Sequence, residues 1–220
     1  MSNIYISLAL TISAGIGFVY GLFRFFRKES VLYVRMIVLG IGCAMLGRLF
    51  GTLLYHVNGE FFNGFNVGML GIIGSFLFFF SANFGQIDSV VDNGSKKFLK
   101  ARIIALAAPI SIAALWCLIF AVFGVNDLTV WVGLEALSLA IASYFHLKHL
   151  IMKDDESGIL RALRVYNLLS LIYAALCLME VIEDCMEAPA FVYIIVCVLE
   201  CVVMLAFVPV LERGVKKWTT

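Results

Sequence analysis

Charged residues are scarce in this sequence, and their scarcity decides its class. Lys, Arg, Asp and Glu together make up 14% of the chain, 63% of the residues are hydrophobic, and the mean hydropathy is +1.02. Soluble globular domains contain about 25% charged residues, so most of this chain is expected to lie in lipid. No polar block is long enough for a separate soluble domain, and we predict one membrane-embedded domain over residues 1–220.

The sequence also lacks the patterns of common metal sites and enzymes. Its six cysteines show no Cys-x-x-Cys or Cys/His spacing, which argues against a zinc site or a disulfide framework. His146 and His149 share one helical face, but we expect them at an interfacial helix end and predict no metal site there. Neither a Ser-x-x-Lys nor a Gly-x-Ser-x-Gly motif occurs. An enzyme is therefore the third choice of function; the residues identify no cofactor, and no nucleic-acid partner is expected.

Long apolar runs predict seven membrane-spanning helices. Each run has the roughly 20 residues that a helix needs to cross a hydrocarbon core about 30 Å thick. The runs lie at residues 4–23, 31–55, 65–83, 101–123, 127–151, 159–182 and 189–211. We therefore expect an all-α, polytopic membrane protein that forms a seven-transmembrane-helix bundle in the bilayer.

Lysine and arginine are missing from alternate loops, and this absence predicts the orientation. The loops at 56–64, 124–126 and 183–188 contain neither residue, whereas basic residues collect in the other loops and at the C-terminal end. Basic loops stay in the cytoplasm by the positive-inside rule. We therefore predict an outside N-terminus and a cytoplasmic C-terminus in a multi-pass protein of the plasma membrane, or of the bacterial inner membrane.

Two further features predict contacts. The pairs Gly17/Gly21 and Gly47/Gly51 place small residues on one helical face, which allows helices to approach closely in lipid, and we expect them to serve packing within the chain. The connector Phe84–Lys100 is the longest one, and its Lys96, Lys97 and Lys100 suit anionic lipid headgroups. It is also the predicted site for a cytoplasmic partner, although a plain solvated connector is the simpler interpretation.

Four charged residues within the predicted spans form the candidate site: Arg48, Glu135, Glu180 and Glu200. Counted from the predicted outer helix ends, Arg48 lies ~10 Å deep, Glu135 ~12 Å, Glu200 ~16 Å and Glu180 only a few Å. A charge inside a membrane needs a partner, so Arg48 is expected to pair with at least one glutamate, and Glu135 is the best match in depth. Glu180 is expected to meet solvent, and Glu200 to face the bundle interior. His56 and Asn167 are further candidates for lining this region.

Two interpretations of these residues stay open. In one, Arg48 and a glutamate only hold the helices in register. In the other, an outward-facing acidic cavity binds a small cationic ligand or a proton. The second interpretation predicts a sensor, receptor or ligand-binding membrane protein, with a proton- or cation-coupled transporter of small solutes as the alternative.

Overall fold

The structure of this protein, a computed structural model, describes residues 2–26, 30–58, 67–152, 158–186 and 189–219, and these residues are almost entirely helical. The α-helices are α1 (Ser2–Gly21), α2 (Leu32–Asn58), α3 (Val67–Ala82), α4 (Ser89–Val91), α5 (Leu99–Ala105), α6 (Ala107–Phe123), α7 (Asp127–Ile151), α8 (Ile159–Met186) and α9 (Ala190–Thr219). Two π-helical segments, Leu22–Phe26 and Asn83–Asp88, continue α1 and α3, and a short 3-10 turn, Lys96–Phe98, precedes α5.

Seven helical stretches are long and apolar enough to cross a membrane, which confirms the predicted helical membrane bundle. Their ends differ from the prediction. The second stretch continues to Asn58, the third to Val91 and the sixth at least to Glu183, and the fourth begins at Lys96. The expected connector 84–100 is therefore mostly helix, and only residues 92–95 link the third stretch to the fourth.

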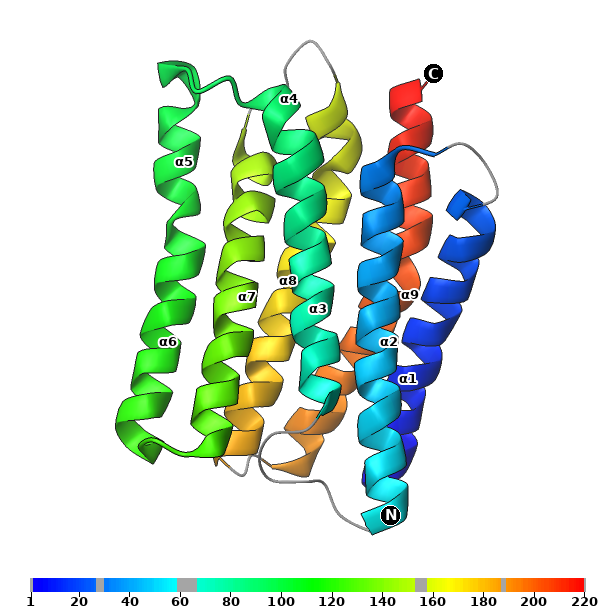
Figure 1. The fold of residues 1–220 in the computed structure, drawn as a ribbon, viewed down its shortest axis with the longest axis vertical. Helices are drawn as coiled ribbons and strands as arrows, with labels where there is room; N and C mark the ends of the chain where they lie inside the picture. The colour runs from blue at the N-terminus through cyan, green and yellow to red at the C-terminus, as the bar shows by residue number, and fades with distance from the viewer. Residues whose placement is uncertain (1, 27–29, 59–66, 153–157, 187–188, 220) are drawn as a thin grey trace.

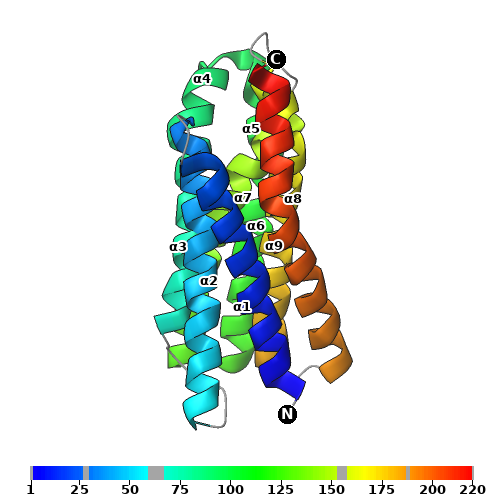
Figure 2. The same cartoon turned by 90° about the vertical axis from the view of Figure 1, so that its right-hand side faces the viewer.

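Six of the long helices close into a ring. Each of α1, α2, α3, α7, α8 and α9 packs against the next, and α9 returns to α1, while α6 packs on the outside against α7 (Figure 1). The two chain ends lie at opposite ends of the bundle (Figure 2). We call these the N-terminal end, where α2 and α8 finish and α9 begins, and the C-terminal end.

Local sequence explains where the outer helices break and start. Pro109 has no N–H to donate to the carbonyl of Ala105, four residues earlier, and the helix is interrupted at Leu106 between α5 and α6. Helix α7 begins with a capping box: Asn126 Oδ1 accepts from the Thr129 N–H at 2.9 Å, and Thr129 Oγ1 accepts from the Asn126 N–H at 3.0 Å.

Glycine permits the closest helix contacts, as the spacing predicted. A Cβ added at Gly47 would lie 2.5 Å from the carbonyl oxygen of Gly68, and one at Gly17 would lie 2.9 Å from that of Met204. These positions bring α2 against α3 and α1 against α9. Gly51 differs, because a Cβ there would meet nothing within 4 Å.

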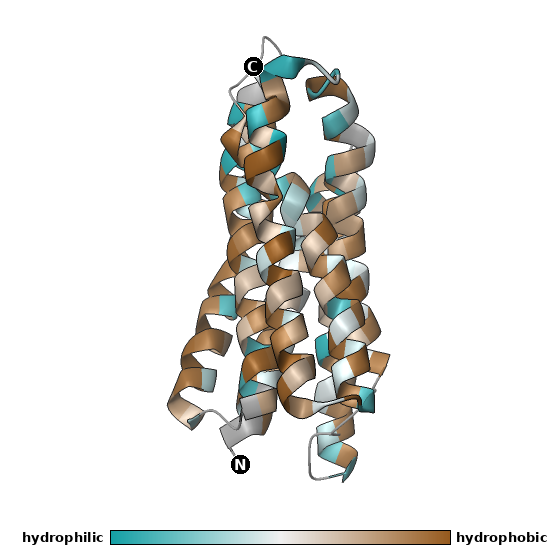
Figure 3. Cartoon of the chain, turned by 90° about the vertical axis from the view of Figure 1, so that its left-hand side faces the viewer, coloured by the Kyte–Doolittle hydropathy of each residue, from teal (hydrophilic) through white to brown (hydrophobic). Residues whose placement is uncertain are grey.

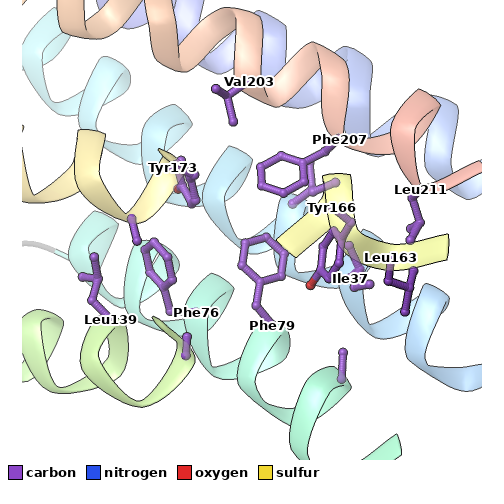
Figure 4. Packing of buried hydrophobic residues seen from close by; sticks show 14 of the residues in the cluster. Ile37, Phe76, Phe79, Leu139, Leu163, Tyr166, Tyr173, Val203, Phe207 and Leu211 are labelled. Carbon is purple, nitrogen blue, oxygen red and sulfur yellow. The ribbon is translucent and has the colours of Figure 1, made fainter. Parts of the chain in front are cut away.

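An aromatic core fills the middle of the ring (Figure 4). Phe76, Phe79, Tyr166, Tyr173 and Phe207 point toward one another from α3, α8 and α9; Phe76 stacks on Tyr173 at 5.0 Å, and the Phe79 and Phe207 ring centroids are 5.5 Å apart. All five side chains are buried. Apolar residues dominate this middle region, and hydrophilic residues gather at the C-terminal end (Figure 3).

Candidate functional site

Arg48 pairs with two glutamates in the half of the bundle toward the N-terminal end. Its Nη2 donates to Glu180 Oε2 at 2.5 Å and to Glu200 Oε1 and Oε2 at 2.7 and 2.8 Å. The three side chains come from α2, α8 and α9, and their exposed fractions are 19%, 13% and 1% respectively. A charged site therefore lies inside the ring, as expected for Arg48 and Glu200.

The partners of Arg48 differ from those that depth suggested. Glu180 was expected to meet solvent, and this prediction is wrong, because its carboxylate contacts Arg48. The reason is the length of α8, which continues to Met186 and places Glu180 about 9 Å inside the helix end. Arg48 and Glu200 are each about 15 Å from the ends of α2 and α9, so the true helix bounds match their depths.

The site holds more negative than positive charge. Glu183 lies three residues beyond Glu180 on α8, and its side chain is also buried, with 8% of the residue exposed. Neither of its carboxylate oxygens makes a hydrogen bond within the described part of the chain, and the same is true of Arg48 Nε. Arg48 thus pairs with Glu180 and Glu200, and a third glutamate, Glu183, lies one turn beyond Glu180 on α8; one buried donor and two buried acceptors are without partners among the described residues.

Three hydroxyl groups lie beside the backbone of Arg48. Thr52, one turn further along α2, donates to the Arg48 carbonyl oxygen at 2.9 Å and lies 2.7 Å from Ser7 Oγ and 3.0 Å from Thr11 Oγ1. These contacts tie α1 to α2 beside the charged site. The Sγ of Cys197, on α9, lies 3.9 Å from Glu180 Oε1. We did not predict these neighbours, because single hydroxyls and thiols in an apolar helix carry no distinctive spacing.

The other three predicted residues lie elsewhere. Glu135 is buried on α7, where it lines a small, mostly apolar pocket between α6, α7 and α8. His56 is exposed on the last turn of α2. Asn167 is buried, but it hydrogen-bonds His146 and lies about 20 Å from Glu180 along α8. It therefore belongs to a different group, on the far side of the aromatic core.

That second group lies toward the C-terminal end. Lys148 Nζ contacts Asp88 Oδ1 at 2.5 Å and Asp92 Oδ2 at 2.9 Å, and Asp92 also pairs with Arg102. Lys148 is only 3% exposed. The ion pairs tie the short turn after α4 to α5 and α7, so this connector is held against the bundle.

His146 and His149 belong to the same group. They lie in the last two turns of α7 and are 1% and 0% exposed, so neighbouring residues cover both rings. The sequence showed that the two histidines share one helical face, because they are three residues apart. It did not predict which residues cover them. Asn83 and Asp88 do so from the π-helical segment, and Asn167 does so from α8.

Asp92 lies in the turn outside the spans, and its ionisation follows from its contacts. The Arg102 guanidinium, which donates from Nε to Asp92 Oδ2 at 2.8 Å, lowers the pKa of this carboxyl, and Lys148 and the Gly94 N–H lower it further. Burial opposes these effects, but the net shift of the pKa is downward. Asp92 is thus a fixed anion that holds Arg102 and Lys148 together.

Within the residues described, no three His, Cys, Asp or Glu side chains gather as a metal site would require, and the six cysteines form no disulfide. Comparison of the chain with protein-family models, with curated proteins and with solved structures gave no match. What the protein does must therefore be argued from its own two charged groups.

Proposed function

We propose that this chain is a membrane receptor or sensor that binds a small cation, either a proton or a protonated amine, at Arg48, Glu180, Glu183 and Glu200. The observation that carries the proposal is the unequal charge of this group. Arg48 balances one carboxylate, which leaves two negative charges in a region that water reaches poorly. Each unbalanced buried charge costs several kcal/mol, so a bound cation would stabilise the site.

The unpaired atoms suggest the chemistry of the ligand. Glu183 offers two acceptor oxygens without partners in the described chain, and Arg48 Nε is a free donor there. A protonated primary amine carries the positive charge and the N–H donors that Glu183 lacks. A proton held by one carboxyl would balance the charge equally well, which makes the proton the simplest candidate.

We place this site on the outer side of the membrane, because the opposite end of the bundle carries the basic residues. The membrane is then the plasma membrane, or the inner membrane of a bacterium. A receptor of this kind would pass its signal to a partner on the cytoplasmic side. The tightly held turn at residues 92–95, between α4 and α5, is the surface that we propose for that contact.

A proton- or cation-coupled transporter is the second candidate, and one observation favours it. Buried charged groups lie on both sides of the aromatic core, and α8 contributes Asn167 to one and Glu180 to the other. A transporter would expose a cation site to each face in turn. In liposomes that contain a pH-sensitive dye, a transporter would acidify the interior after external acidification, and Glu200→Gln would prevent this; a receptor would leave the interior unchanged.

Ligand binding can be tested by thermal unfolding of the purified protein in detergent. Methylammonium chloride is titrated at constant ionic strength, with tetraethylammonium chloride as a cation that has no N–H donor. At a concentration ten times its Kd, a ligand stabilises the folded state by about 1.4 kcal/mol, which raises the Tm of a chain of this size by about 3–6 °C. We expect a saturable rise with methylammonium, or a rise as the pH is lowered from about 8 to about 5.

The matched variants are Glu183→Gln, which removes the unpaired charge, and Asp127→Asn, which removes an exposed charge at the same end. We expect Glu183→Gln to abolish the response and Asp127→Asn to retain it. If wild-type protein responds to neither methylammonium nor protons, or if Glu183→Gln responds as the wild type does, the proposal is wrong.

A further inference from the structure

The group at the C-terminal end forms one continuous chain of polar contacts that the proposed cation site does not use. It runs through four separate elements and the turn after α4. Its members, in order of contact, are Arg102, Asp92, Lys148, Asp88, His149, Asn83, His146 and Asn167. Five of the eight are at most 3% exposed. A buried network of this size is costly unless every member finds a partner, so its hydrogen-bond pattern is informative.

The π-helical segment Asn83–Asp88 brings two of these residues to the same ring. In an α-helix, residues five apart point in widely different directions, whereas the wider turn of a π-helix brings them closer to one face. Asn83 Oδ1 lies 3.2 Å from His149 Nδ1, and Asp88 Oδ1 lies 3.0 Å from His149 Nε2. Short π-helical segments occur frequently at functional sites, and here the segment places an oxygen at each nitrogen of His149.

This arrangement suits a charged ring. A neutral imidazole carries one N–H, whereas an imidazolium carries two and donates from both nitrogens. With an oxygen at each nitrogen, His149 makes both hydrogen bonds only as the imidazolium. The neutral ring fits equally well if the Asn83 amide is reversed, because Asn83 Nδ2 then donates to Nδ1 while Nε2–H still donates to Asp88. The two orientations of an amide have nearly the same shape.

Reversal of the Asn83 amide also changes the hydrogen bond at His146. The other end of the amide, Asn83 Nδ2, lies 2.8 Å from His146 Nδ1. In this orientation Nδ1 accepts a hydrogen bond, so the His146 proton resides on Nε2; after reversal, Asn83 Oδ1 accepts from Nδ1–H. Asn167 Oδ1 lies 2.9 Å from the same nitrogen, and Asn167 Nδ2 makes no hydrogen bond in the described chain. Asn167 can therefore turn to present whichever group His146 requires.

We propose that His149 is a buried proton-binding site, and that Asn83 relays its protonation to His146 by reversing its amide. Uptake places one proton on His149 Nδ1, whose lone pair had accepted from Asn83 Nδ2. On release, Nδ1 gives this proton back to water while Nε2–H keeps its hydrogen bond to Asp88, and Asn83 Nδ2 again donates to Nδ1. The exchange requires no redox partner and changes the charge of the group by one.

The charges around His149 permit both states. Asp88 and Asp92 face it from the segment after α3, Lys148 from α7 and Arg102 from α5, and His146 is the other titratable ring. Two acids and two bases balance when His149 is neutral, and the group carries one positive charge when it is protonated. Asp88, which is 15% exposed at its side chain, accepts from Nε2–H in both states.

The site lies across the aromatic core from Arg48, and it is independent of the proposed cation site. Because its residues differ from those of the cation site, a failure of one proposal leaves the other standing. Proton binding here would act on the geometry of α3, α7 and α8 at the end of the bundle that we predict to be cytoplasmic.

The test is ¹⁵N NMR of the full chain in lipid nanodiscs, with label only on histidine. The chain has three histidines, and the variants His56→Gln, His146→Gln and His149→Gln assign the ring signals. His56 is exposed at the opposite end and serves as the control. As the pH falls from about 8 to about 5, we expect the unprotonated-nitrogen signal of His149 to disappear. At the same midpoint, the His146 proton should move from Nδ1 to Nε2.

A second variant tests the relay itself. Asn83→Asp keeps the shape of the side chain but offers only acceptor oxygens, so His149 should stay an imidazolium over the whole pH range and His146 should not change tautomer. Three results would overturn the proposal: a wild-type His149 that stays neutral or stays charged throughout, a His146 tautomer that ignores His149, or an unchanged titration in Asn83→Asp. The first two come from wild-type protein and do not depend on how a variant folds.

Discussion

The contacts of Arg48 predict that Glu200→Gln lowers the stability of the wild-type protein but raises the stability of the Arg48→Met variant. Glu200→Gln in the wild-type protein weakens two hydrogen bonds to Arg48 Nη2, and we expect it to cost about 1–2 kcal/mol. Arg48→Met leaves Glu180 and Glu200 as unpaired buried carboxylates, and removal of one partner of a buried pair costs about 3–5 kcal/mol. In the Arg48→Met background, however, Glu200→Gln removes a charge without a partner. There it should stabilise the protein.

The reversal can be measured with a double-mutant cycle. Unfolding of the wild type, the two single variants and the double variant is followed in mixed detergent micelles, and the interaction energy is obtained from the four free energies. The control is a second cycle between Arg48→Met and Glu212→Gln. Glu212 pairs with Arg24 and Lys216 toward the C-terminal end, about 18 Å from Glu200 along α9, so its effect should simply add.

The contact between Arg48 and Glu200 sets the expected size of the coupling. Groups that share a buried network couple by about 0.5–3 kcal/mol, and we expect the upper part of that range because Glu200 is 1% exposed. If the losses in the Arg48/Glu200 cycle add as they do in the Arg48/Glu212 cycle, the direct pairing is refuted. An interaction energy near zero would also contradict the proposal that Arg48 balances one carboxylate of the cation site.

Two further predictions follow from the packing and from the turn at the C-terminal end. Gly47→Ala places a Cβ 2.5 Å from a carbonyl oxygen of α3 and should cost about 1–3 kcal/mol. Gly51→Ala meets nothing within 4 Å and should gain up to about 1 kcal/mol from helix propensity; equal Tm values for the two variants would contradict this. For Asp92, the lowered pKa predicts stability that is fully present above about pH 4 and is lost as the pH falls further, because protonation breaks its bonds to Arg102 and Lys148. Thermal unfolding of wild type and Asp92→Asn should therefore differ most at neutral pH and converge below about pH 4, and a constant difference would contradict the assignment.

Part of the candidate site followed from the sequence and part did not. Arg48 stood out because a charge is costly within an apolar span, and Glu200 stood out for the same reason. Their partners depended on where each helix ends. The spans were predicted from hydropathy, which stops at the first charged residues, and α8 continues past Glu183 to Met186. That extra turn moved Glu180 from the predicted surface to the interior.

The second charged group shows a different limit. His146, Lys148 and His149 were predicted to lie at an interfacial helix end, because they come at the predicted cytoplasmic end of their span. They are buried because Asn83 and Asp88 reach them from a π-helical segment. A π-helix has no sequence signature that separates it from the α-helix that it continues, so neither the segment nor the network that it organises could be predicted.

By itself, the sequence determined the class of the protein: an all-helical chain with seven stretches able to cross a membrane, and an arginine that must find an acid within them. The bilayer enforces this, because a backbone in lipid must satisfy its own hydrogen bonds, and a long apolar helix does so with no help from its neighbours. The tertiary structure alone decided which acids meet Arg48 and which side chains enclose His149. These choices depend on the rotation, length and local winding of each helix, which are set by packing against other helices through contacts such as that of Gly47 with α3.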